Sequence, residues 1–167
     1  MPEHIYYTDA DMRSDLHSIV RQMGLEAFRP EIVVGLARGG LSPALMLSHY
    51  YDAALMAVNV SLRDNKVDNG HDSLDTLKKD VLAGKRVLIV DDICDSGHTL
   101  KVVWDYLGIP LPKPLDFTSG YSGFVRTAVL WNNPGQDVFD PQYVGREINR
   151  LEDERWIIFP FEDWWTR

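Results

Sequence analysis

The stretch VLIVDDICDSGHTL, at residues 87–100, constrains the fold more than any other part of the chain. Its apolar start predicts a strand buried on both faces, and the loop that leads to Thr99 predicts the beginning of a helix. Between them lie three carboxylates, Asp91, Asp92 and Asp95. A buried strand that ends in acids and then opens a helix brings carboxylates and free backbone amides to one place. Such a place suits a ligand that carries a phosphate together with hydroxyls or a metal ion.

Helical and strand-like patterns alternate along the rest of the chain. Apolar residues at helical spacing follow Thr8 and Asp9, which can cap a first helix, and Gly24 ends it. Ser42 is the candidate cap of a second helix, with Pro43 at its first position. Strands are expected at 32–36, 54–60, 86–91 and 125–131, and a third helix at 99–107. The alternation predicts an α/β fold in which helices flank a mostly parallel sheet and ligands bind at the carboxyl ends of its strands.

Composition limits the classes of protein to which the chain can belong. Its 167 residues suffice for a single domain, 1–167, and a hydrophobic fraction of 45% argues against disorder. No segment has the length and apolar character of a membrane helix, and the N-terminal residues lack the pattern of a signal peptide. A net charge of −8 without a basic patch argues against nucleic acid as a partner. The single cysteine, Cys94, excludes an internal disulfide and favours the cytoplasm.

The loop at residues 95–99, Asp-Ser-Gly-His-Thr, carries groups that can bind a phosphate monoester. It stands directly before a helix, where free amides carry a partial positive charge, and His98 contributes its backbone amide. Ser96 and Thr99 add hydroxyl donors, and Gly97 permits a tight bend and a close approach of the backbone. An ordinary capped turn between a strand and a helix would have the same composition, so the loop alone leaves both interpretations open.

The paired acids Asp91 and Asp92 add a second function to this point. Where a strand ends, both carboxylates can turn towards one ligand and accept hydrogen bonds from a sugar diol, or hold Mg²⁺ through a bound substrate. Tandem acids also follow apolar strands in other folds that bind phosphate. The acids and the phosphate loop, separated by two residues, together make a specific pattern.

The complete pattern resembles the phosphoribosyl diphosphate (PRPP) signature of the type I phosphoribosyltransferases. The match covers the apolar run, the paired acids, two further apolar residues and the Asp-Ser-Gly-His-Thr loop. It implies a parallel sheet flanked by helices, with a small hood formed by the N- and C-terminal segments. It also implies that Asp91 and Asp92 hold the ribose hydroxyls, one of them helping to place Mg²⁺, and that residues 95–99 cradle the 5′-phosphate.

A second segment, Gly-Leu-Ala-Arg-Gly-Gly at residues 35–40, is similar to the loop with which this family binds diphosphate. The resemblance makes Ala37, Arg38 and Gly39 the diphosphate contacts and implies a cis peptide bond between Ala37 and Arg38. Taken alone, the Arg-Gly-Gly sequence would indicate a simple turn.

A third segment, from Ser61 to Lys79, is polar and lacks a clear strand pattern. By the resemblance it corresponds to the mobile loop that closes over the active site, and Ser61, Arg63 and Lys66 are its candidate contacts with the substrate. Charged side chains that are simply solvated are the alternative interpretation of this segment.

The C-terminal segment resembles the purine-binding end of the xanthine–guanine and hypoxanthine–guanine enzymes. In these an aromatic residue stacks on the base, the backbone of the next residue reads its edge, and an acid follows. Trp156, Ile157 and Glu162 occupy those positions, although packing in the core or a dimer interface would also explain an aromatic tail. The basic residue that contacts the purine 6-oxygen in this branch falls near Asn133, which is an amide here.

The resemblance therefore implies a purine phosphoribosyltransferase with Mg²⁺ as cofactor and a homodimer or homotetramer as its assembly. The reaction would transfer phosphoribosyl from PRPP to guanine, xanthine or hypoxanthine, with release of diphosphate, in purine salvage. Asp95 is the candidate catalytic residue, because it can take or hold the proton at the imidazole nitrogen of the base. Two alternatives stay open: transfer to another base such as orotate, and a regulator that binds PRPP or a nucleotide without catalysis.

Overall fold

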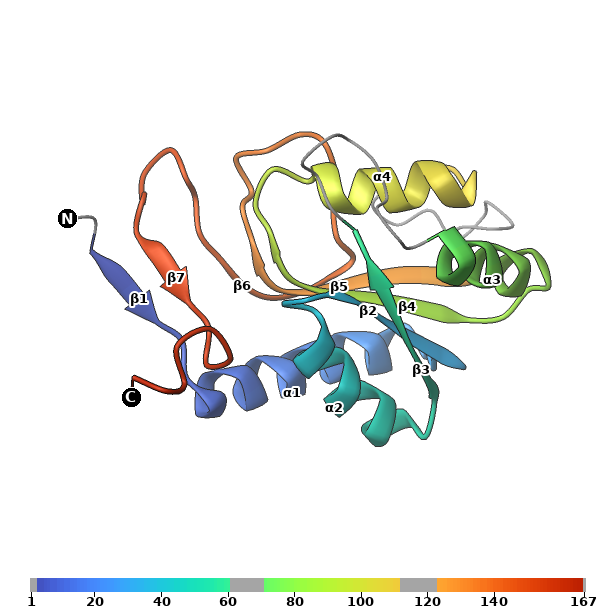
Figure 1. Ribbon diagram of the computed structural model, residues 1–167, viewed down its shortest axis with the longest axis horizontal. Helices are drawn as coiled ribbons and strands as arrows, with labels where there is room; N and C mark the ends of the chain where they lie inside the picture. Colours follow the sequence, from blue (N-terminus) through green and yellow to red (C-terminus); the bar gives the residue numbers. More distant parts are fainter. Residues whose placement is uncertain (1–2, 61–70, 112–122, 167) are drawn as a thin grey trace.

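A computed structural model describes residues 3–60, 71–111 and 123–166 of the chain. Its larger sheet has the strand order β3-β2-β4-β5-β6, and each neighbouring pair is parallel (Figure 1). The strands are β2 (Ile32–Ala37), β3 (Ala54–Asn59), β4 (Val87–Cys94), β5 (Val125–Asn132) and β6 (Tyr143–Glu147). The prediction of a mostly parallel sheet is confirmed, and β4 is its central strand.

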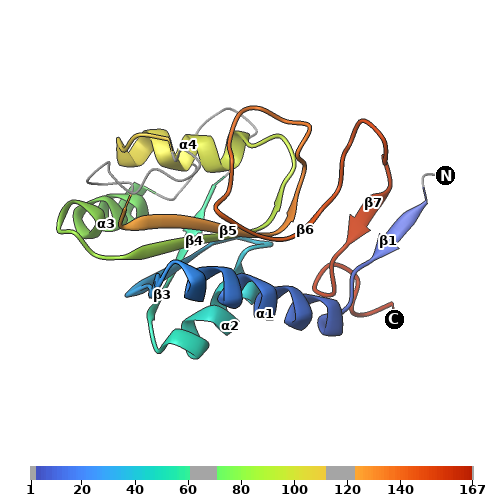
Figure 2. The ribbon, with the colours of Figure 1, turned by 180° about the vertical axis from the view of Figure 1, so that it is seen from behind.

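Helices cover both faces of this sheet. Two lie on one face, α1 (Asp9–Leu25) and α2 (Leu41–Tyr51), and two on the other, α3 (His71–Leu82) and α4 (His98–Leu107) (Figures 1 and 2). Because the sheet is buried on both sides, the central strand is apolar at successive positions. Val87 and Ile89 belong to the core cluster under α3 and α4, whereas Leu88 and Val90 belong to the cluster over α1 and α2.

No helix in residues 3–60, 71–111 and 123–166 is long and apolar enough to cross a bilayer.

The two ends of the chain form a smaller sheet beside the main one. β1 (His4–Tyr6) pairs in parallel with β7 (Trp156–Ile158), so that Ile5 lies opposite Ile157. Figure 1 shows this pair set apart from the five-stranded sheet, with both termini next to it. The predicted hood of N- and C-terminal segments is therefore confirmed.

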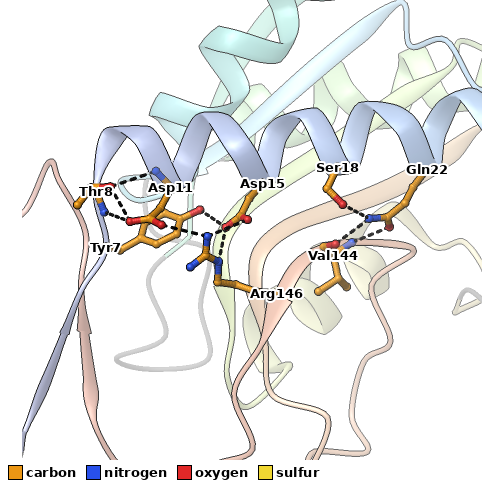
Figure 3. A network of polar contacts seen from close by, with 8 residues as sticks. All are labelled: Tyr7, Thr8, Asp11, Asp15, Ser18, Gln22, Val144 and Arg146. Atoms are coloured by element: carbon orange, nitrogen blue, oxygen red, sulfur yellow. Dashed lines mark hydrogen bonds and ion pairs between the residues drawn. The ribbon is translucent and has the colours of Figure 1, made fainter.

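A polar network fastens the hood to the main sheet (Figure 3). The Tyr7 hydroxyl, directly after β1, donates a hydrogen bond of 2.5 Å to Oδ2 of Asp15 on α1. Arg146 on β6 donates to the same carboxylate through Nε at 2.7 Å and Nη2 at 3.0 Å. Its guanidinium also lies 5.1 Å from the centre of the Tyr7 ring. Burial and the hydrogen bond to Asp15 raise the pKa of Tyr7, so the hydroxyl stays a donor.

The boundary of the polar segment after β3 differs from the prediction. Residues 71–79 were expected to belong to a mobile loop, but they lie in α3, so this part of the prediction is wrong. Leu74, Leu77 and Val81 are buried in the core at spacings of three and four residues, which is the helical period. Ser61, Arg63 and Lys66, the candidate loop contacts, lie outside the described residues.

Replacing Arg146 with Ala should lower the free energy of unfolding by about 2–3 kcal/mol, because the Asp15 carboxylate would stay buried without its cation. Urea denaturation at pH 7 measures the change. Arg155→Ala is the matched control: Arg155 pairs with Asp153 at 2.7 Å in an exposed position, where a much smaller loss is expected. Equal losses in the two variants would contradict the anchoring role of Arg146.

Candidate functional site

A pocket of about 320 Å³ opens at the carboxyl ends of β2 and β4. Three stretches of chain line it: the end of β2 with the turn after it, the end of β4, and the loop before α4. It brings together nearly all residues that the sequence assigns to PRPP, namely Ala37, Arg38, Gly39, Asp91, Asp92, Asp95, Ser96, Gly97 and Thr99. The topology explains this, because neighbouring parallel strands end at the same edge of a sheet.

The paired acids lie within β4, which continues to Cys94 and is longer than the strand predicted at 86–91. The alternation of faces along the strand breaks at this end. Ile93 packs against the cluster over α1 and α2, and Cys94 belongs to the cluster under α3 and α4, the reverse of what a strict two-residue period from Val87 gives. As a result Asp91 and Asp92 line the same pocket.

Both carboxylates sit where ionisation is costly. Asp91 is only 9% exposed, and burial raises its pKa well above the ordinary value of 3.8, with a further contribution from the charge of Asp92. Burial also raises the pKa of Asp92. Backbone amides offset part of the cost: the amide of Asp92 donates to Asp91 Oδ1 at 3.0 Å, and the amide of Ile93 donates to Asp92 Oδ1 at 2.8 Å. A ligand that brings hydroxyl donors or a cation would lower the free energy of the ionised pair.

The turn after β2 lies directly against one of these carboxylates. A side chain at Gly39 would overlap with the carboxylate of Asp92, so only glycine fits there. The peptide bond between Ala37 and Arg38 is cis, which confirms the prediction. Arg38 is exposed, and within the described residues its guanidinium forms no ion pair or hydrogen bond.

Two helices begin at this pocket without a side-chain cap. Gly40 is the N-cap of α2 and Gly97 is the N-cap of α4, whereas α1, which starts elsewhere, has a complete capping box formed by Thr8 and Asp11. The predicted cap of α2 at Ser42 is wrong, because the helix already starts at Leu41. In α2 the amide of Leu41 donates to the carbonyl of Arg38 at 3.2 Å, and Pro43 has no N–H group. Both helices present the positive end of their dipole to the pocket, which suits an anion.

Gly97 has a backbone conformation that other residues adopt poorly. Its φ is 75°, and an added Cβ would meet Oε1 of Gln136 at 2.6 Å. The glycine therefore lets the loop turn tightly from β4 into α4. Beside it, the amide of His98 lies 3.5 Å from Oγ of Ser96.

A second, more open pocket of about 600 Å³ adjoins the first. The two share Asp95 and Ser96, and the second adds His98, Asn133 and Trp156 to its wall. Asp95 thus stands at the junction between them. The Trp156 side chain, on β7 of the hood, is 58% exposed and therefore has a ring face available to a planar ligand.

The other two residues expected at the base line neither pocket. Ile157 is 3% exposed, and its neighbour Ile158 accepts a hydrogen bond of 3.0 Å from the amide of Tyr7 through its carbonyl. Since successive carbonyls along a strand point to opposite sides, the carbonyl of Ile157 points away from β1. Glu162 accepts a hydrogen bond of 2.9 Å from the amide of Phe159 and closes the turn at the end of the hood.

Asn133 has its amide engaged within the protein. Nδ2 donates to the carbonyl of Asp95 at 3.0 Å, and Oδ1 accepts from the amides of Gly135 at 3.0 Å and Arg150 at 3.3 Å. The Arg150 side chain lines the second pocket and was not foreseen from the sequence, because it belongs to no motif and stands among several other arginines. Its Nε donates to Oδ1 of Asp95 at 3.0 Å.

Replacing Asp91 and Asp92 together with Asn should raise the free energy of unfolding at neutral pH, because it removes two buried charges. Their pKa values are raised in the folded state, so the folded protein binds more protons than the unfolded one above pH 3.8. The stability of the wild type should therefore fall relative to the variant as the pH rises from that value. Urea denaturation of both proteins from pH 4 to 8 tests this, and parallel stability curves would contradict it.

Comparison with known proteins places these features in a family. A hypoxanthine-guanine phosphoribosyltransferase of Schizosaccharomyces pombe is 26% identical over 121 residues, which are 59% of this chain and 57% of the relative. One of Aquifex aeolicus is 35% identical over 91 residues, 52% of this chain and 50% of the relative. The chain thus matches only about half the length of these two relatives. A xanthine-guanine phosphoribosyltransferase of Idiomarina loihiensis is 28% identical over 156 residues, 89% of this chain and 83% of the relative.

Solved structures share the fold. A purine phosphoribosyltransferase from Pyrococcus horikoshii superposes with a TM-score of 0.67 at 24% identity, covering 96% of this chain and 95% of that one. The relatives come from the purine branch that the C-terminal segment resembles, which confirms that resemblance. The family model described as the phosphoribosyl transferase domain matches residues 15–163, and the chain therefore belongs to the phosphoribosyl transferase domain family.

Proposed function

We propose that the protein is a Mg²⁺-dependent purine phosphoribosyltransferase of purine salvage. It transfers phosphoribosyl from PRPP to a 6-oxopurine, which is guanine, xanthine or hypoxanthine, and releases diphosphate. One observation carries the proposal: the pocket that gathers the paired acids, the uncapped helix starts and Arg38 adjoins a second pocket with an exposed tryptophan, and Asp95 stands between them. The arrangement suits two substrates that react where the pockets meet.

PRPP occupies the first pocket in this proposal. Asp91 and Asp92 accept hydrogen bonds from the ribose hydroxyls, which adds donors to the backbone amides that already contact these buried carboxylates. The loop from Asp95 to Thr99 holds the 5′-phosphate with its amides at the start of α4. The amides of the turn at 37–39 and the Arg38 guanidinium face the diphosphate and stabilise it as it leaves.

The donor set also fits Mg²⁺. Carboxylate oxygens are preferred ligands of this ion, and the raised pKa values of Asp91 and Asp92 mean that a cation beside them would stabilise their charged forms. Two carboxylates provide only part of the about six oxygens that Mg²⁺ takes, so diphosphate, ribose and water would supply the others. When bound, the ion supplies positive charge that neutralises the diphosphate.

The base occupies the second pocket. Trp156 stacks on it, and the backbone of Ile157, whose carbonyl points away from β1, reads its edge. Asp95 touches the imidazole side of the base and takes or holds its proton during transfer. Asn133 acts through the backbone of Asp95 and Arg150, which it holds together, and Glu162 shapes the turn that follows β7.

The remaining parts of the proposal concern assembly and location. A homodimer or homotetramer is supported by the apolar side chains exposed on α2 and the edge strand β3, which are Leu41, Leu45, Tyr50 and Leu55. The cytoplasm is proposed because Cys94, the chain's single cysteine, is a buried free thiol.

Incubation of the protein with PRPP, Mg²⁺ and a panel of bases tests the function through diphosphate release. Guanine, xanthine or hypoxanthine should be turned over in preference to adenine and orotate. Excess chelator should abolish turnover, because the basic groups of the site are too few to neutralise the diphosphate. Full turnover in chelator would contradict the metal requirement.

Two controls sharpen the assay. The variant with Asn at both Asp91 and Asp92 should bind PRPP at least about tenfold more weakly in calorimetry, since it loses charge-assisted hydrogen bonds to the ribose and the ion. Arg155→Ala, which changes an exposed ion pair outside both pockets, should match the wild type. Binding of PRPP without turnover of any base would instead favour a regulator.

A further inference from the structure

Arg150 is the charged side chain closest to the candidate catalytic residue for which the function above assigns no contact with substrate. It lies between β6 and β7, its side chain is 20% exposed, and it lines the second pocket with Trp156. Its guanidinium is fixed from two sides: Nε donates to Oδ1 of Asp95 at 3.0 Å, and Nη1 donates to the carbonyl of Arg155 at 2.6 Å. Within the described residues no group accepts a hydrogen bond from Nη2.

The side chain of Asn133 holds the backbones of Arg150 and Asp95 next to one another. Its Oδ1 accepts from the Arg150 amide and its Nδ2 donates to the Asp95 carbonyl, so one amide group ties both backbones to the end of β5. A second hydrogen bond, from the amide of Gly135, also ends on this Oδ1. An oxygen that already accepts two hydrogen bonds has little capacity left for a base. The cationic donor that this wall offers to a ligand is the guanidinium of Arg150.

The pair presents an acceptor and a donor next to one another. A 6-oxopurine matches it, because an N–H at the imidazole nitrogen can donate to Asp95 while the adjacent 6-oxygen can accept from Arg150. A 6-aminopurine offers an NH₂ group where the 6-oxygen would be, and its hydrogens would oppose those of the guanidinium. Arginine has no acceptor and keeps its charge, so it cannot adapt to the amino group.

We propose that Arg150 is a specificity-determining residue, which donates a hydrogen bond to the 6-oxygen of the base and thereby selects 6-oxo over 6-amino purines. Asn133 carries no charge, and Arg150, in the segment between β6 and β7, provides the cation instead. The inference rests on the proposed function. In it, the ion pair between Arg150 and Asp95 is present before the base binds. On binding, the base enters between the two groups and takes one hydrogen bond from each.

Competition kinetics on Arg150→Ala test the proposal. Hypoxanthine and adenine compete against whichever base the wild type turns over best, and their inhibition constants are compared. In the variant the ratio that favours hypoxanthine should fall at least about tenfold, since the lost bond is made to a charged group. Binding of hypoxanthine should weaken, whereas that of adenine should stay the same or tighten. Arg150→Lys, which keeps a cation, should recover part of the preference.

Two further measurements separate specificity from a structural role. Lys85→Ala, which removes an exposed ion pair with Asp80 outside both pockets, should keep the wild-type ratio, and PRPP affinity measured by calorimetry should be unchanged in every variant. If Arg150→Ala weakens hypoxanthine and adenine equally, the residue only supports the fold and the inference is overturned. If the wild type turns over no base of the panel, it is the proposed function itself that fails.

Discussion

Two carboxylates buried at the end of the central strand are the constraint around which the site is arranged. Asp91 and Asp92 lie on β4, where burial opposes their ionisation, and the apolar packing of the rest of the strand must offset that cost. The turn after β2 comes so close that only glycine fits at position 39. A site of this kind is less stable empty than it would be with neutral residues, and it gains most from a ligand that brings hydroxyls or a cation.

Positive charge near this site comes from few and local sources. The chain as a whole carries a net charge of −8, so its overall field repels an anionic substrate. The uncapped starts of α2 and α4 and the side chain of Arg38 counter this field at short range. Because free amides are fixed by the backbone, they need no reorganisation when charge develops on a leaving group. These groups supply the local positive charge that the proposed phosphate-bearing substrate requires.

The position of the hood depends on contacts far from either pocket. Trp156 belongs to β7, which among the described strands pairs only with β1. The chain leaves β1 through Tyr7, whose hydroxyl donates to Asp15, and Asp15 in turn accepts from Arg146. Trp156, the aromatic residue of the second pocket, is therefore held in position by a network whose members, Tyr7, Asp15 and Arg146, line neither pocket. A change in that network would move the Trp156 ring relative to Asp95 without touching a ligand.

The sequence by itself determined the features that depend on neighbours along the chain. The strand with its acids, the loop before α4 and the cap of α1 at Thr8 were predictable, because each depends on a few consecutive residues. The polar residues around it concealed α3 in the sequence, because the helical period shows only when its buried apolar residues, Leu74, Leu77 and Val81, are considered together.

Only the tertiary structure decided which distant residues meet. The pairing of Arg150 with Asp95, separated by 55 positions, and the use of the Asn133 amide within the protein follow from how β5, β6 and the hood pack. No local pattern encodes such contacts, since a side chain acquires its partners only when the sheet brings strand ends together. The residues at the end of β4 could therefore be recognised from the sequence, whereas the contacts of Asn133 and Arg150 were decided by packing.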